Sequence, residues 1–131
     1  MIAAMFPHAA TTEDVTVRVA VTYLPEQSAD GRWFWAYHIR IENAGERAVQ
    51  LLNRRWLISD GRGARHQVEG PGVVGEQPVI APGDAYDYVS GCPLPTPTGA
   101  MRGSYEMVDE DGRTFEVAIP RFPLAAPVST A

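Results

Sequence analysis

The sequence predicts an all-β protein, an immunoglobulin-like or fibronectin type III-like sandwich of about seven strands. Three observations favour this fold class. Short segments such as Val15–Tyr23 alternate between apolar and polar residues, which is the pattern of half-buried strands. Turn sequences such as Asp60-Gly61 and Asp109–Gly112 separate these segments. No stretch has helical spacing, and a run of short strands with regular turns is typical of a sandwich or barrel.

The first two strands have the clearest pattern. In Val15–Tyr23 the valines and Tyr23 share one face, so this face is expected to be buried. The second strand is expected over 32–42. Its apolar face, which we expect in the core, consists of Trp33, Trp35, Tyr37, Ile39 and Ile41. Phe34 lies on the opposite face.

The third strand begins near Ala48 and changes parity along its length. Val49 and Leu51 fit one face, whereas Trp56 and Ile58 fit the other. A β-bulge within 52–55 reconciles the two halves, because one extra residue restores the buried face.

The remaining strands are expected over 65–69, 85–91, 99–108 and 113–119. The prolines of 92–98 predict an extended connection without strand pairing, since proline has no N–H to donate. The expected organisation is a flexible N-terminal arm over 1–12, one sandwich domain over 13–124 and a flexible C-terminal tail over 125–131.

Length and charge limit the classes of function. The 131 residues suit one domain, and the net charge of −5 argues against nucleic acid as a partner, which requires a basic face. The single cysteine, Cys92, allows no internal disulfide and suits a reducing cytoplasm, where we expect the protein to be localised. No stretch approaches the ~18 consecutive apolar residues of a membrane span.

The segment Gly70–Pro78 has the glycine spacing G-x-G-x-x-G of a dinucleotide-binding turn. In such a site a helix follows, and its N-terminus holds the pyrophosphate. Pro78 and Pro82 exclude that helix here. Two interpretations remain: the glycines allow positive φ or close packing, or their backbone N–H groups, with a nearby arginine, accept a phosphate or carboxylate.

The candidate ligand or partner loop is therefore Gly70, Gly72, Gly75, Glu76 and Gln77, together with Arg54 and Arg55. Adjacent strand residues face opposite ways, so one arginine would point inward unless the bulge turns both towards solvent. The pair is either solvated or a clamp for an anion or a partner, because guanidinium binds carboxylate and phosphate through two hydrogen bonds.

No catalytic residues, cofactor or metal site are predicted. His8, His38 and His66 have no chelating spacing, and the acidic run 109–111 suits a solvated turn better than a calcium loop. Cys92 has no basic neighbour to activate it, so we expect a buried structural thiol.

Several separate motifs occur along the chain: Ile41–Asn43, Gln50–Trp56, Val68–Pro78, Ala81–Gly83, Ser90–Leu94 and Gly103–Val108. These motifs occur in the same order in the ApaG proteins, and the chain resembles that family from about Val15 to Leu124. Two positions depart from the family pattern. Pro71 stands where the family usually has an acidic residue, and residues 53–55 replace the more usual Ser-Arg-His.

The resemblance implies a fibronectin type III-like sandwich and a small bacterial cytoplasmic protein associated with cobalt and magnesium resistance or efflux. Two functions remain open. The first is a non-enzymatic protein-interaction or regulatory module with an unidentified protein partner. The alternative is a binder of a small anionic, phosphate-bearing ligand or a divalent cation through the glycine-rich loop, with weak anion binding expected.

Overall fold

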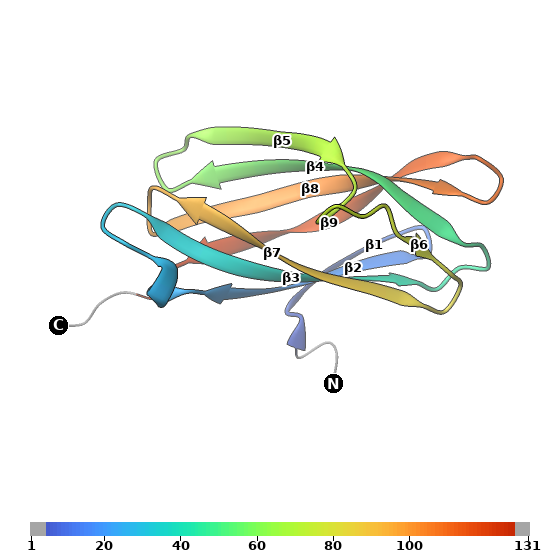
Figure 1. The fold of residues 1–131 in the computed structure, drawn as a ribbon, viewed down its shortest axis with the longest axis horizontal. Coiled ribbons are helices and arrows are strands. Elements are labelled where there is room, and N and C mark those ends of the chain that lie inside the picture. The colour runs from blue at the N-terminus through green and yellow to red at the C-terminus, as the bar shows by residue number, and fades with distance from the viewer. Residues whose placement is uncertain (1–4, 128–131) are drawn as a thin grey trace.

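In the computed structural model, which describes residues 5–127, nine strands form two antiparallel sheets packed face to face (Figure 1). The first sheet has the order β1-β2-β3-β7, and its strands are β1 His8–Thr12, β2 Val15–Tyr23, β3 Trp33–Asn43 and β7 Ala85–Leu94. The second has the order β5-β4-β8-β9, with β6 on β4. Its strands are β4 Val49–Asp60, β5 Arg65–Pro71, β6 Val79–Ile80, β8 Thr98–Asp109 and β9 Thr114–Ala125. The predicted all-β sandwich is confirmed.

Helical structure is scarce in the described residues, and the element η1 is a short 3-10 turn over Pro25–Gln27. None of the helical structure in residues 5–127 is long and apolar enough to cross a membrane.

The expected apolar face of β3 forms the centre of the core. Trp35, Ile39 and Ile41 are fully buried, and Ile39 lies opposite Val19 of β2. The alternation of the sequence therefore gave the correct face. One polar atom is left without a partner: the indole Nε1 of Trp35 is buried and has no hydrogen-bond acceptor among the described residues.

The bulge predicted in the third strand is present. The pairing of β4 with β8 shifts register between Leu51 and Asn53. Both Leu51 and Trp56 are consequently buried although their sequence parity differs. The same shift places Arg54, two residues before Trp56, on the face that looks into the sandwich.

Three expectations differ from the structure. Instead of a flexible arm over 1–12, His8–Thr12 form β1, which pairs with β2 along its whole length. The strand β9 continues to Ala125 instead of ending at Ile119. The strand β7 continues through Pro93 to Leu94. Prolines are tolerated there because β7 and β9 are edge strands, where an N–H can be missing without breaking a ladder. The rest of the predicted arm and tail, residues 1–4 and 128–131, lies outside the described residues.

The two long sides of the sandwich differ. On one side β9 meets β1, where the amide of Ala118 donates to Oγ1 of Thr12 at 3.0 Å. The other side, which we call the open side, lies between the edge strands β5 and β7. Within the described residues no strand bridges β5 and β7, and the segment that joins β5 to β6 crosses the space between the sheets (Figure 1).

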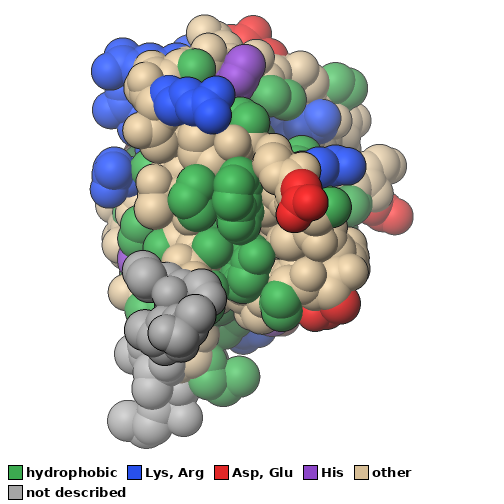
Figure 2. All heavy atoms as spheres, turned by 90° about the vertical axis from the view of Figure 1, so that its left-hand side faces the viewer, with side chains coloured by type: hydrophobic (Ala, Val, Ile, Leu, Met, Phe, Trp, Pro, Cys, Tyr) green, Lys and Arg blue, Asp and Glu red, His purple; other side chains and the backbone are tan. Residues whose placement is uncertain are grey.

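Hydrophobic side chains also gather at one end of the sandwich, the end at the left of Figure 1 (Figure 2). Basic side chains flank this apolar cluster along one rim in the same view (Figure 2). This end of the molecule therefore presents an apolar surface next to a basic rim.

Candidate functional site

The glycine-rich loop is a tight turn that leads from β5 to β6. The amide of Val73 donates to the carbonyl oxygen of Glu76 at 2.8 Å, and the amide of Glu76 donates back at 2.9 Å. The two central residues, Val74 and Gly75, have φ of 44° and 81°, as in the type I′ turns of hairpins. A β-branched residue with positive φ is a true outlier, so the turn holds Val74 in a strained conformation.

Gly72 is required by the path of the chain. Its φ is 62°, and a Cβ at this position would overlap the carbonyl oxygen of Glu76. Gly75 also has positive φ, but the space around it is open. Gly70 lies under the guanidinium of Arg54, where a Cβ would come within 3.1 Å of Nη2. Each of the three positions therefore has its own structural reason for a glycine.

Arg54 holds this turn in place. Its Nη1 donates to the carbonyl oxygen of Pro71 at 2.9 Å and to that of Gly72 at 3.0 Å. Because Arg54 lies on the inward face of β4 and is only partly exposed, its charge is placed between the sheets. Within residues 5–127 the amides of Val74 and Gly75 have no protein acceptor.

Arg55 points away from the loop. It forms ion pairs on the outer face of the second sheet, with Glu69 at 2.9 Å and with Glu116 at 3.8 Å. The two arginines therefore have different hydrogen-bond partners, Arg54 in the loop and Arg55 on the outer face of the sheet. Both also contribute to the surface around Gly70 and Pro71, and a joint clamp for an anion or a partner stays a prediction.

Glu76 and Gln77 support the turn in different ways. Glu76 contributes the backbone pair with Val73, and its side chain is exposed. The Nε2 of Gln77 donates to the carbonyl oxygen of Leu52 at 2.9 Å, which fastens the loop to the bulged part of β4. The side chain of Gln77 therefore links the loop directly to the bulge.

A pocket of about 230 Å³ opens beside the turn, between the sheets on the open side. Its lining consists of Tyr37, Arg54, Trp56, Val73, Val74, Gly75, Tyr88 and Ser90. We call it the Arg54 pocket. Arg54 is the one charged residue of this lining, and the remaining polar side chains are hydroxyls.

The tyrosines of the Arg54 pocket are neutral. Burial raises the pKa of Tyr37 and that of Tyr88, and the Tyr88 hydroxyl is hydrogen-bonded to that of the fully buried Tyr105. A pocket with one guanidinium, neutral hydroxyls and no carboxylate favours an anionic group.

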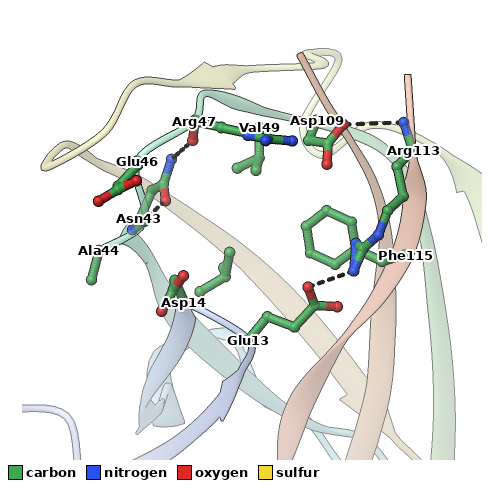
Figure 3. A pocket seen from close by; sticks show the side chains of 12 residues that line it. Glu13, Asp14, Asn43, Ala44, Glu46, Arg47, Val49, Asp109, Arg113 and Phe115 are labelled. Carbon is green, nitrogen blue, oxygen red and sulfur yellow. Dashed lines mark hydrogen bonds and ion pairs between the residues drawn. The ribbon is translucent and has the colours of Figure 1, made fainter. Parts of the chain in front are cut away.

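A second and larger pocket, of about 530 Å³, lies where the β1–β2, β3–β4 and β8–β9 turns meet (Figure 3). Two of the charged residues in its lining form an ion pair with each other. Arg113 bonds Glu13 at 2.6 Å and lies 5.1 Å from the centroid of Phe115. Asn43 is buried and donates to the carbonyl oxygen of Arg47 at 2.7 Å (Figure 3). This arrangement stabilises the turns.

The other sequence candidates are dispersed. His38 bonds Asp87 at 2.8 Å on the outer face of the first sheet, and His8 and His66 lie elsewhere. Among the described residues no three His, Cys, Asp or Glu side chains are grouped to hold a metal. Cys92 is buried, and burial raises the pKa of its thiol to about 11.

The sequence indicated the loop and Arg54 as candidates but gave no sign of the aromatic side chains that line the pocket with them. Tyr37 and Tyr88 come from β3 and β7 of the opposite sheet. Alternation indicates that both point inward, yet only sheet packing brings them to Arg54.

Known proteins resemble this chain over most of its length. The sequence pattern of the ApaG domain matches residues 24–109. Protein ApaG of Paramagnetospirillum magneticum is 57% identical over 89% of this chain and 92% of its own. Protein ApaG of Caulobacter vibrioides is 54% identical over 90% of this chain and 86% of its own. The crystal structure of the ApaA protein of Bordetella pertussis superposes with a TM-score of 0.85 at 48% identity, covering 88% of this chain and 96% of that one.

Proposed function

The chain belongs to the ApaG family, and we propose that it is a non-enzymatic interaction module that binds a protein partner at the turn Gly72–Glu76. We place it in the cytoplasm, as a regulator. Any effect on cobalt and magnesium resistance or efflux, which the family resemblance implies, would then be exerted through the partner.

The observation that carries this proposal is the conformation of Val74. Its side chain is 60% exposed and apolar, at a φ that a valine rarely adopts. Strained residues persist where the surrounding structure determines them, and they cluster at binding sites. Here Arg54 and Gln77 provide that support from β4 and from the loop itself.

The position of the turn also suits a partner. Val79, next to the turn in β6, is 64% exposed, so two apolar side chains face solvent within one short segment. Exposed apolar side chains grouped in this way mark interaction surfaces more often than isolated ones.

The test is retention of a partner from cell extract by immobilised protein. Val74→Gly removes the apolar side chain, and glycine adopts the positive φ of this position without strain, so the fold is expected to persist. The amount of partner that the immobilised protein retains should fall at least tenfold. Arg62→Gly, in the exposed β4–β5 turn, is the matched control and should retain the partner. Equal retention by Val74→Gly and the unchanged protein would contradict the proposal.

A second candidate function is binding of a small anion at the same turn. It is supported by the Arg54 guanidinium together with the amides of Val74 and Gly75, which have no acceptor among residues 5–127. Titration of ¹⁵N-labelled protein with inorganic phosphate should shift the amides of 73–76 with a millimolar dissociation constant, about 4 kcal/mol of binding free energy. The absence of saturable shifts would reject this candidate.

A further inference from the structure

Strand β7 has a free edge. It is the last strand of the first sheet, and its only strand partner in the described residues is β3. The amide of Asn43 donates to the carbonyl oxygen of Asp84 at 3.0 Å, and hydrogen bonding alternates along an antiparallel pair. The even-numbered residues of β7 therefore bond to β3. The backbone groups of Asp87, Val89 and Gly91 consequently point to the open side.

This edge has weaker protection than the other free edge. Edge strands are usually guarded by charge, and β5 carries Arg65 and Glu69 along an exposed surface. The centre of β7 carries Val89 instead, which is 58% exposed. Protection of β7 is confined to Asp87 on one side and Pro93 on the other. The five residues between them, 88–92, include no charged residue and no proline.

The Arg54 pocket lies directly inside this edge. Tyr88 and Ser90, which line it, are the inward-facing neighbours of Val89. Residues that pair across two strands share a face, so a residue opposite Tyr88 or Ser90 on an added strand would point into the pocket. The charge that it meets there is Arg54.

We propose that the open side binds an extended acidic segment of the partner, which adds a fifth strand to β7 and places one carboxylate side chain beside Arg54. The inference rests on the interaction function proposed above and names the kind of partner. Backbone pairing supplies the affinity, and the carboxylate supplies the selection, as in other complexes formed by strand addition. A carboxylate matches a guanidinium between two sheets better than a neutral group does.

The test uses synthetic seven-residue peptides of alternating Thr and Val with a central Glu, Gln or Lys, capped at both ends. Binding is followed by the amide shifts of ¹⁵N-labelled protein. The Glu peptide should bind with a sub-millimolar dissociation constant and shift Asp87, Val89 and Gly91. The Gln and Lys peptides should bind at least tenfold more weakly. Equal binding of the Glu and Lys peptides would overturn the proposal.

Two proline variants test which edge is used. Val89→Pro removes an N–H that points to the open side and leaves the bonds to β3 intact, so binding should fall at least tenfold. Gln67→Pro is the matched control on β5. The amide of Gly72 donates to the carbonyl oxygen of Leu52, so even-numbered residues of β5 bond to β4 and the N–H of Gln67 points outward. The Gln67→Pro variant should bind the Glu peptide as tightly as the unchanged protein does. The two-dimensional amide spectra establish that both variants are folded. Loss with Gln67→Pro but not with Val89→Pro would place the segment on β5 and overturn the proposal.

Two further results separate this inference from the proposed function. Acetate that shifts the amides around Arg54 as strongly as the Glu peptide does, without shifts in β7, would mean an anion pocket and no strand addition. A partner that Val74→Gly loses and Val89→Pro keeps would support the turn as the interaction site and overturn strand addition alone. Loss of a partner by both variants supports both.

Discussion

The Nη1 atom of Arg54 lies 3.0 Å from the carbonyl oxygen of Gly72. This hydrogen bond joins a bulged strand of one sheet to the first glycine of the turn. It explains why an arginine can point into a sandwich: its donors satisfy carbonyl groups that would otherwise be left without a partner between the sheets.

Arg54→Met is therefore expected to reduce the free energy of unfolding by about 1–3 kcal/mol, since two carbonyl oxygens lose a charged donor. Arg55→Met is the matched control. Its ion pairs are exposed to solvent, so its effect should be within about 1 kcal/mol. Urea denaturation measures both, and equal costs would contradict the inward role of Arg54.

Gly72→Ala and Gly75→Ala are expected to differ. Both residues have positive φ, but only at Gly72 does a Cβ overlap a backbone oxygen. Gly75→Ala should cost about 1 kcal/mol of backbone strain, and Gly72→Ala about 1–3 kcal/mol or more because the turn must also open. Thermal unfolding of the two variants provides the comparison. Equal losses would mean that backbone strain alone sets the cost and that the overlap at Gly72 adds nothing.

Trp35→Ala should cost about 3–5 kcal/mol, because a fully buried indole is replaced by a methyl group. Trp35→Phe should cost much less than Trp35→Ala. It keeps most of the aromatic packing and removes an N–H that has no acceptor in the part of the chain that the structure describes. Chemical denaturation distinguishes the two, and a cost of Trp35→Ala under about 1 kcal/mol would place this side chain outside the core.

Stability should fall as the pH rises above about 9. Burial raises the pKa of Cys92 from 9.0 to about 11 and also raises the pKa of Tyr37, Tyr88 and Tyr105. The unfolded chain therefore loses these protons first, and between pH 9 and 11 the native state binds more protons than the unfolded state. The chain has no lysine to titrate in this range.

Urea denaturation from pH 8 to 10.5 measures this effect. Cys92 contributes about 2 kcal/mol to this decline between pH 8 and 10.5, at about 1.4 kcal/mol for each pH unit between the two pKa values. Cys92→Ala should consequently show a shallower decline than the unchanged protein. Stability that rises with pH in this window would contradict the assignment.

The turn Gly72–Glu76 should bind NAD and ATP only with millimolar or weaker dissociation constants, about 4 kcal/mol at best. The chain continues from the turn into β6, so there is no helix N-terminus to hold a pyrophosphate. Pro71 also lacks an N–H, and the net charge of −5 opposes a polyphosphate. Saturable micromolar amide shifts centred on Gly70–Gly75 would restore nucleotide binding as a function.

The sequence alone determined the local features of this protein. Alternation assigned the buried faces of β2 and β3, because side chains of a strand point to opposite faces in turn. The change of parity between Leu51 and Trp56 located the bulge for the same reason. Pro78 excluded a helix after the glycines through its ring and its missing N–H.

Other features depend on contacts between strands and could not be predicted from local sequence patterns. Residues 8–12 have almost no apolar period, and they become β1 because β2 offers them an edge. Pro120 and Pro123 do not end β9, because its outer side needs no donors at those positions. Arg54 and Arg55 are neighbours of the same type, and their different roles follow from the face each occupies after the bulge. Tyr37 and Tyr88 reach Arg54 only because two sheets pack face to face, a relationship between residues far apart in the chain that no local pattern encodes.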